Sequence, residues 1–284
     1  MIPSILRSLV RPLALCAAFA LAAPAFAQQA EEQPIPTHQS WSFAGPFGRY
    51  DTAQLQRGFK VYKEVCSNCH ALGIPFRTLS QPGGPEFSKG QVEALAATYQ
   101  IDDVNDKGEA IKRPGRPADT IPWIFANKAA AAAAFGKAPP NMNLLAKARS
   151  FSDGFPWFVV NLFTQYQEQG PDWIYAILNG YSKPEDRKWN LYFPGHAIAM
   201  PSPLDSLFDP KTGKALNAGF YTDGTPVTKE QVSKDVAAFL MWAAEPSLDA
   251  RKRIGFRVMA FLIAFAFLAY FTKKKVWSDV HAHA

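Results

Sequence analysis

The chain has 284 residues, of which 48% are hydrophobic and 19% charged, so it can bury a sizeable core. Its formal net charge of +6 would suit a nucleic-acid-binding protein, but residues 28–250 hold 21 Lys and Arg against 23 Asp and Glu. The positive excess therefore lies at the two ends of the chain, where basic residues flank apolar segments. This distribution argues against a nucleic-acid partner and favours a membrane.

The N-terminal segment has the three parts of a secretory signal. Two arginines precede a short apolar run, and the run ends in the small residues that a signal peptidase needs. We expect residues 1–27 to be a cleaved signal peptide, with the mature chain beginning near Gln28; an uncleaved anchor is the alternative. Cleavage would remove Cys16, leaving only Cys66 and Cys69 in the exported protein.

The two remaining cysteines belong to the sequence Cys66-Ser-Asn-Cys69-His70. Two cysteines in an exported protein usually form a disulfide, but Cys-x-x-Cys followed directly by His is typical of covalent c-type haem attachment. Each thiol can add to one haem vinyl group, and the imidazole can bind the iron. Upstream, Leu55 and Phe59 begin an apolar stripe that predicts a helix leading into the motif. A redox dithiol and half a zinc site are the alternatives, although zinc needs two more ligands.

Three segments of distinct composition follow the motif. An acidic group at residues 102–109 can attract a basic partner through its long-range field, or can simply be a solvated loop. The alanine-rich segment 128–135 predicts a short exposed helix. The aromatic segment 151–170 is either core or an apolar surface against other subunits, and the sequence alone does not separate these two interpretations.

A haem iron with a second strong protein ligand mainly transfers electrons, so a downstream Met or His is expected as the sixth ligand. Met241 falls in a helical pattern and is expected in the core. The candidates that remain are His38, Met142, His196 and Met200. Met200 lies in the proline-rich stretch NLYFPGHAIAMPSPL, where a stiff loop suits a distal ligand. It is the strongest candidate, and Met142 and His196 stay open.

The last part of the chain predicts turns and two helices. Residues 209–231 suggest turns with a small hairpin, and a helix is expected over residues 231–244. The apolar run 254–271 is long enough, at ~1.5 Å per residue, to cross the hydrocarbon layer. Basic residues flank this run on both sides, so we expect a transmembrane anchor at residues 251–275. The export signal then predicts that residues 276–284 form a cytoplasmic tail.

Several of these stretches together resemble the cytochrome c1 family, the haem subunits of cytochrome bc1 complexes, in its alphaproteobacterial branch. The stretches are GPFGRYDTAQLQRGFKVYKEVCSNCHAL, PPNMNLLAKAR, YFPGHAIAMPSPL and DVAAFLMWAAEP, followed by one membrane helix. The haem motif is shared with every c-type cytochrome. The methionine loop and the junction between MWAAEP and the membrane helix are far more specific.

The resemblance implies a mainly α fold: a c-type cytochrome haem domain with long loop insertions at residues 28–250, plus one C-terminal transmembrane helix. It implies one covalently bound haem c. It also implies electron transfer from the Rieske iron–sulfur protein to cytochrome c, beside cytochrome b, with lipid around the anchor. The chain would not be catalytic alone. The haem domain would lie on the periplasmic side of the inner membrane.

Two other functions remain alternatives. One is a different membrane-anchored monohaem c-type cytochrome that serves an oxidase or a dehydrogenase. The other is a haem sensor or peroxidase with an open iron.

The resemblance also implies roles for individual residues. Cys66 and Cys69 would carry the haem, His70 would be the proximal iron ligand, and Met200 matches the family's methionine ligand. Some bacterial relatives carry a further cysteine pair before the methionine loop. This chain lacks that pair, so packing and prolines must hold the loop.

Three further residues match positions near the haem in the family. Arg149 matches an arginine beside a haem propionate, which a guanidinium can pair in bidentate fashion. Pro139 and Pro140 begin the loop that, in the family, covers one haem face. Trp173 falls where an aromatic side chain lies near the haem.

Overall fold

The computed structural model describes residues 33–152, 154–164, 166–183 and 185–278. The expected signal peptide and most of the expected tail lie outside these residues. The helices are α2 (Thr52–Glu64), α3 (Lys89–Ala97), α4 (Lys128–Phe135), α5 (Leu145–Ala148), α6 (Trp157–Thr164), α7 (Gln169–Asn179), α8 (Lys229–Ala244) and α9 (Leu248–Val276). Short 3-10 turns are η2 (Cys66–Asn68), η3 (Phe76–Ser80) and η4 (Pro203–Ser206), and the strands are β1 (Gln100–Val104) and β2 (Ala110–Pro114). The fold is mainly α, as predicted.

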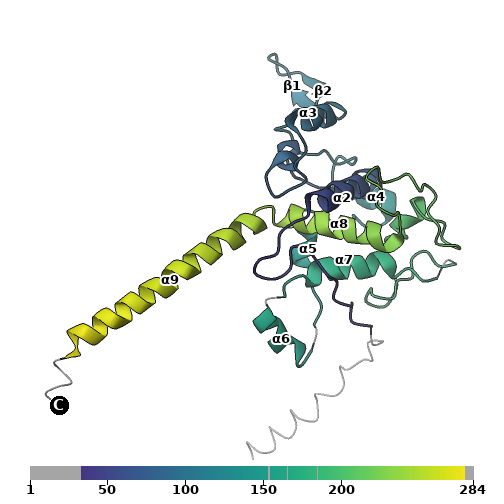
Figure 1. Cartoon of the computed structure of the whole chain (residues 1–284). Coiled ribbons are helices and arrows are strands. Elements are labelled where there is room, and N and C mark those ends of the chain that lie inside the picture. The colour runs from purple at the N-terminus through teal and green to yellow at the C-terminus, as the bar shows by residue number, and fades with distance from the viewer. Residues whose placement is uncertain (1–32, 153, 165, 184, 279–284) are drawn as a thin grey trace, which may run out of the picture.

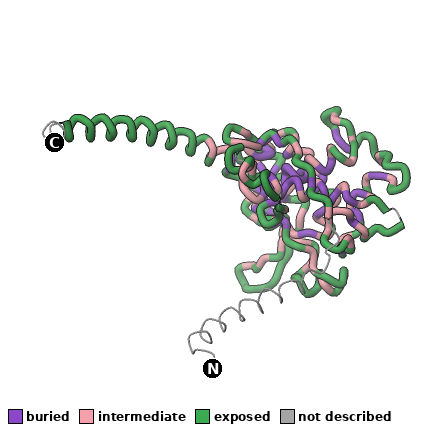
Figure 2. Tube along the Cα trace, turned by 90° about the horizontal axis from the view of Figure 1, so that it is seen from below, coloured by how far each residue is buried: buried purple, intermediate pink, exposed green. Residues whose placement is uncertain are grey.

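The centre of the body is α8, which packs mainly against α2 and α7 (Figure 1). Burial concentrates where these helices meet (Figure 2). Phe239, Met241 and Trp242 of α8 are almost completely buried, which confirms that Met241 belongs to the core. Each such side chain stabilises the fold by about 1.5–3 kcal/mol through removal of apolar surface from water.

The contact between α2 and α8 is unusually close at Gly58. A Cβ added at Gly58 would lie 2.0 Å from the carbonyl oxygen of Asp235. The neighbouring Arg57 donates from Nε to the Asp235 carboxylate (2.9 Å) and from Nη1 to Asp223 (2.8 Å). The absence of a side chain at Gly58 and the Arg57–Asp235 ion pair therefore fix the packing of α2, the helix before the haem motif, against α8.

The acidic group lies on and beside the β1–β2 hairpin. Asp102 pairs with Lys112 (2.7 Å), and Asp103 pairs with Arg113 across the antiparallel strands. Half of the group is therefore neutralised locally, which weakens its long-range field. This hairpin was not predicted from the sequence. One was suggested at residues 209–231 instead, where the described residues show only an isolated antiparallel bridge between Ala215 and the preceding Phe208. Pro210 and Pro226 lie in that segment and cannot donate to a ladder.

Helix α9 projects away from the body and matches the predicted anchor (Figure 1). Its most apolar 18-residue window has a mean hydropathy of 2.1 and none of it is buried, so its surface suits lipid. The Lys252 ammonium donates to the carbonyls of Phe43 (2.5 Å) and Gly45 (2.6 Å), which ties the base of α9 to the body. The helix begins at Leu248, slightly before the expected anchor.

Candidate haem site

The Cys-x-x-Cys-His sequence forms one tight turn directly after α2. Asp51 caps the start of α2, accepting from the Gln54 N–H (2.9 Å). At the other end, the N–H groups of Cys69 and His70 both donate to the carbonyl of Cys66 (3.1 and 2.9 Å). This turn places both thiols and the imidazole on one short segment.

The cysteines are free thiols rather than a disulfide. Burial raises the pKa of the Cys66 thiol to about 12, and burial also raises the pKa of Cys69. Among the residues that the structure describes, no group of three or more His, Cys, Asp or Glu side chains gathers as a metal site, which argues against zinc. Two thiols at this spacing, one buried and one partly exposed, fit two thioether bonds to a haem.

The His70 imidazole is held in the orientation that an iron ligand needs. Its side chain is buried, and its Nδ1 lies 2.8 Å from the carbonyl oxygen of Pro140. A carbonyl only accepts, so Nδ1 carries the proton and Nε2 keeps its lone pair. Burial lowers the pKa of His70, which favours this neutral form. The donor set therefore fits a c-type haem, with Nε2 available to the iron.

The segment after Pro140 is fastened to the chain just beyond His70. The Met142 N–H donates to the carbonyl of Ala71 (2.9 Å), and the Gly73 N–H donates to the Asn143 side chain. Met142 is buried in the core. This segment therefore approaches His70 from the Nδ1 side of the ring, and the Met142 side chain is taken up by the core. This placement argues against Met142 as the sixth ligand.

Met200 lies in an irregular loop, and individual hydrogen bonds from side chains to backbone carbonyls hold this loop in place. Its carbonyl accepts from the Tyr181 hydroxyl (3.0 Å). Buried Asn190 donates to the carbonyl of Ile177 (2.7 Å) and anchors the start of the loop to α7. Within the described residues no hydrogen bond or ring contact joins this loop to the Cys66–His70 turn, so the ligand role of Met200 stays a prediction.

The two candidate histidines for the sixth position each stack on an aromatic side chain. The His196 ring stacks on Trp189 at 4.8 Å, and its Nδ1 lies 3.0 Å from the carbonyl of Asn190. His38 stacks on Tyr166 at 4.3 Å. Neither contact brings these rings to the haem motif.

The structure brings Arg149 and Trp173 together. The Arg149 guanidinium lies over the Trp173 ring, 5.5 Å from its centroid. Arg149 is exposed, and no carboxylate of the described part of the chain pairs with it. A cation oriented by an aromatic face fits the predicted pairing with a haem propionate.

Sequence reasoning missed two residues that brace the motif. The Trp123 indole N–H donates to the carbonyl of Cys69 (3.0 Å), and the Tyr62 hydroxyl donates to that of His70 (3.3 Å). The helical stripe through α2 could have identified Tyr62. Trp123 lies in a loop 54 residues from its partner, and no spacing rule points to it.

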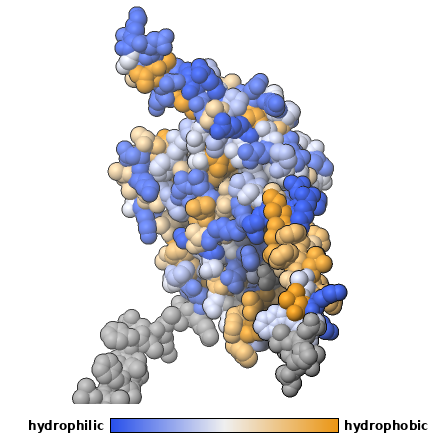
Figure 3. All heavy atoms as spheres, turned by 90° about the vertical axis from the view of Figure 1, so that its left-hand side faces the viewer, coloured by the Kyte–Doolittle hydropathy of each residue, from blue (hydrophilic) through white to orange (hydrophobic). Residues whose placement is uncertain are grey.

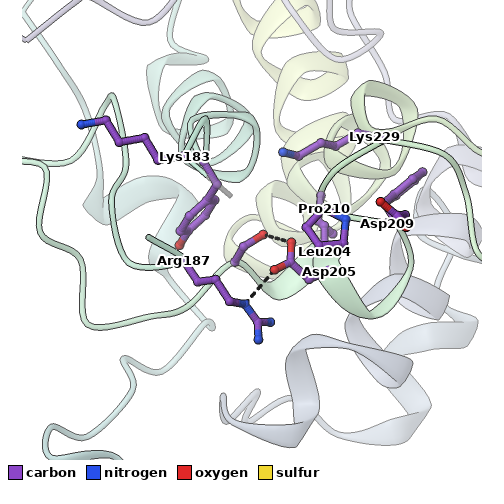
Figure 4. Close-up of a pocket in the computed structure, with 11 residues that line it drawn as sticks. Lys183, Arg187, Leu204, Asp205, Asp209, Pro210 and Lys229 are labelled. Carbon is purple, nitrogen blue, oxygen red and sulfur yellow. Dashed lines mark hydrogen bonds and ion pairs between the residues drawn. The ribbon is translucent and has the colours of Figure 1, made fainter. Parts of the chain in front are cut away.

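A small cavity lies beside the Met200 loop rather than at the haem motif (Figure 4). It measures about 70 Å³ and its lining includes Tyr181, Lys183 and Lys229. At its edge Asp205 accepts from the Ser202 hydroxyl (2.6 Å) and from Arg187 Nε (2.9 Å). The cavity holds none of the predicted haem-binding residues, and its polar contacts brace the chain that follows Met200.

Comparisons with known proteins agree with the motif and the fold. The model of the cytochrome C1 family matches residues 41–280. The chain is 54% identical over 257 residues to a cytochrome b/c1 of Bradyrhizobium diazoefficiens, covering 87% of this chain but only 36% of that longer protein. It is 48% identical to a cytochrome c1 of Blastochloris viridis (94% and 95% covered) and 42% identical to one of Rhodospirillum rubrum (94% and 97% covered). The chain therefore belongs to the cytochrome c1 family.

Proposed function

We propose that this chain is the haem-bearing electron-transfer subunit of a quinol–cytochrome c oxidoreductase. It receives one electron from the Rieske iron–sulfur protein and passes it to cytochrome c. Family membership supports electron transfer to cytochrome c, and the long exposed α9 supports anchoring in a membrane. The chain alone performs no bond-making chemistry on quinol.

One observation carries the proposal: the hydrogen bond from His70 Nδ1 to the Pro140 carbonyl, within the turn that holds both thiols. It presents Nε2 as the proximal ligand, while Cys66 and Cys69 would hold one haem c covalently. Met200 would be the sixth ligand. The haem supplies a one-electron couple, and a thioether ligand in a dry pocket raises its reduction potential.

The remaining site residues would position the haem rather than bind its iron. Arg149 would pair with a propionate, with Trp173 holding the guanidinium in place. Pro140 would cover one haem face while it accepts the hydrogen bond from His70. These roles rest on the contacts described above and on the family pattern.

The proposed cellular arrangement follows from the two ends of the chain. Residues 1–27 would be removed during export, placing the haem domain, residues 28–250, in the periplasm. Residues 251–275 would anchor it in the inner membrane beside cytochrome b, with residues 276–284 in the cytoplasm. The three lysines that end α9 suit the cytoplasmic interface.

Affinity isolation of the tagged full-length chain in mild detergent tests the proposed partners. We expect cytochrome b and an iron–sulfur protein to co-purify, and added quinol to reduce the haem of this preparation but not that of the chain alone. Co-purification with a terminal oxidase or a dehydrogenase, without cytochrome b, would support a different membrane-anchored cytochrome instead.

A further inference from the structure

The short helix α6 exposes large apolar side chains on more than one side. None of its residues is buried. Phe158 is 64% exposed and Phe163 is 81% exposed, and Trp157 and Val160 are exposed as well. Adjacent residues of a helix point about 100° apart, so exposure of both Trp157 and Phe158 cannot come from one narrow stripe.

Charge is also missing from this helix. The sequence WFVVNLFT contains no Asp, Glu, Lys or Arg, and its polar side chains are one asparagine and one threonine. A helix on a water-facing surface normally carries a charged face, and a helix that is apolar all round is normally immersed in protein or lipid. Helix α6 therefore calls for an apolar environment beyond the burial that the described part of the chain gives it.

A second exposed aromatic residue locates the membrane relative to the body. Phe47, in the loop before α2, contacts Phe256 in the apolar part of α9, with ring centroids 5.7 Å apart and both side chains exposed. Phe256 follows the basic Arg251–Arg253 triplet, at the level where the anchor leaves the headgroups. The loop that carries Phe47 therefore lies at the membrane surface.

Helix α6 lies on this same side of the molecule. In Figure 1, α6 projects from the body toward the side into which α9 extends, with the loop before α2 between them. Figure 3 looks at this side with α9 pointing toward the viewer, and hydrophobic residues, those of the anchor among them, gather toward its lower right while the upper projection is hydrophilic. Helix α6 therefore lies on the side of the molecule from which the anchor extends.

We propose that α6 and Phe47 form a membrane-contact face, with α6 lying in the interface of the periplasmic leaflet. Trp157 and the phenylalanines would sit at the headgroup–acyl boundary, where aromatic side chains are enriched. The occupant is lipid rather than a neighbouring subunit, because α6 is uncharged, leaves only the side of Asn161 and Thr164 polar, and shares its side of the molecule with α9. This second contact fixes the tilt of the haem domain above the membrane, which goes beyond electron transfer itself.

Site-directed spin labelling tests the proposal in the full-length haem-loaded chain. Nitroxides are attached to Phe158→Cys and Phe163→Cys in vesicles of phosphatidylcholine and phosphatidylglycerol, and to the same variants in the isolated complex. The matched control is Val104→Cys, an apolar residue that is 61% exposed on the hairpin far from α9 (Figure 1). Each label is scored by its collision rate with oxygen, which enters lipid, relative to a water-soluble nickel chelate.

We expect the ratio of oxygen to nickel collisions to be several-fold higher at residues 158 and 163 than at residue 104, in vesicles and in the complex. Equal ratios at all three positions would place α6 in water and overturn the proposal. Low collision rates with both reagents in the complex would show that another protein covers α6, which also overturns it. If Phe158→Cys or Phe163→Cys loses its haem spectrum, the label is attached to Trp157→Cys instead, and its collision ratio is interpreted in the same way.

Discussion

The two sides of the proposed haem iron are built in different ways. On the proximal side, the Cys66–His70 turn continues from α2, which packs along α8. Hydrogen bonds with Trp123 and Pro140 hold this turn in place. On the distal side, Met200 lies in a loop without a helix or strand, held by hydrogen bonds such as that from Tyr181.

Because of this difference, we expect haem attachment and global stability to depend on one region and access to the iron to depend on the other. Packing of regular helices over a core resists local opening, whereas a loop held by a few hydrogen bonds opens at lower cost. Changes near α2 should therefore alter haem attachment and global stability. Changes in the Met200 loop should alter access to the iron and leave the fold intact.

The largest effect is expected from the double substitution Cys66→Ser and Cys69→Ser. Without thiols no thioether can form, so covalent haem is lost completely. The measurement is haem staining after denaturing electrophoresis. The control is Ser67→Ala, between the two cysteines, which removes only a hydroxyl that donates to the Lys63 carbonyl (2.6 Å) and should retain the stain. Covalent haem in the double variant would refute the attachment site.

Removing the ion pair between α2 and α8 should have the next largest effect. Arg57→Ala leaves Asp235, whose side chain is 0% exposed, without its cation, which costs about 3–5 kcal/mol of unfolding free energy. Lys112→Ala breaks an exposed pair on the hairpin and should cost only about 0–1 kcal/mol. Urea unfolding in detergent, followed by haem absorbance, compares the two. Equal losses would contradict the special role of the α2–α8 contact.

A glycine comparison probes the same contact without changing charge. Gly58→Ala forces a methyl group against the Asp235 carbonyl, and we expect a loss of about 1–3 kcal/mol from overpacking. Gly90→Ala, in α3, meets no heavy atom within 4 Å and should stabilise by about 0.5–1 kcal/mol. Thermal unfolding measures both. If Gly58→Ala is neutral, the helices are not held at this close distance.

The smallest effect is expected on the distal side. Tyr181→Phe removes the donor to the Met200 carbonyl, worth about 0.5–1.5 kcal/mol, and should loosen the loop locally. We expect slight carbon monoxide binding by the reduced protein with little change in global unfolding. Tyr192→Phe, in the same loop, is the control, because its hydroxyl makes no hydrogen bond within the described residues. Indistinguishable variants would show that this bond does not hold the loop.

Regular apolar patterns made parts of the fold predictable. The stripe from Leu55 predicted α2, the alanine run matches α4, and the 254–271 run lies within α9. The β1–β2 hairpin was missed because each strand carries two adjacent like charges, Asp102-Asp103 and Lys112-Arg113, which pair only across the turn. The repeat of apolar residues along the sequence identifies the buried face of one helix or strand. It does not show which distant segment supplies the opposite charge of an ion pair.

The residues of the candidate haem site show the same difference between local patterns and long-range contacts. Cys66, Cys69 and His70 were identifiable because covalent chemistry fixes their spacing within one turn. The acceptor for His70 was not, because the Pro140 carbonyl is a backbone group 70 residues away. Long-range contacts of this kind depend on the whole fold, so they emerge only from the structure.

The central claim is that Met200 closes the iron opposite His70, and one measurement tests it most directly. Visible spectra of the reduced, detergent-solubilised protein are recorded with and without carbon monoxide, for the wild type and for Met200→Leu, a swap of similar volume. We predict that the wild type ignores carbon monoxide and that the variant binds it, with a large fall in reduction potential. Carbon monoxide binding by the wild type would show an open iron and contradict the account, and binding by neither protein would assign the sixth position to another residue, with His196 first to test.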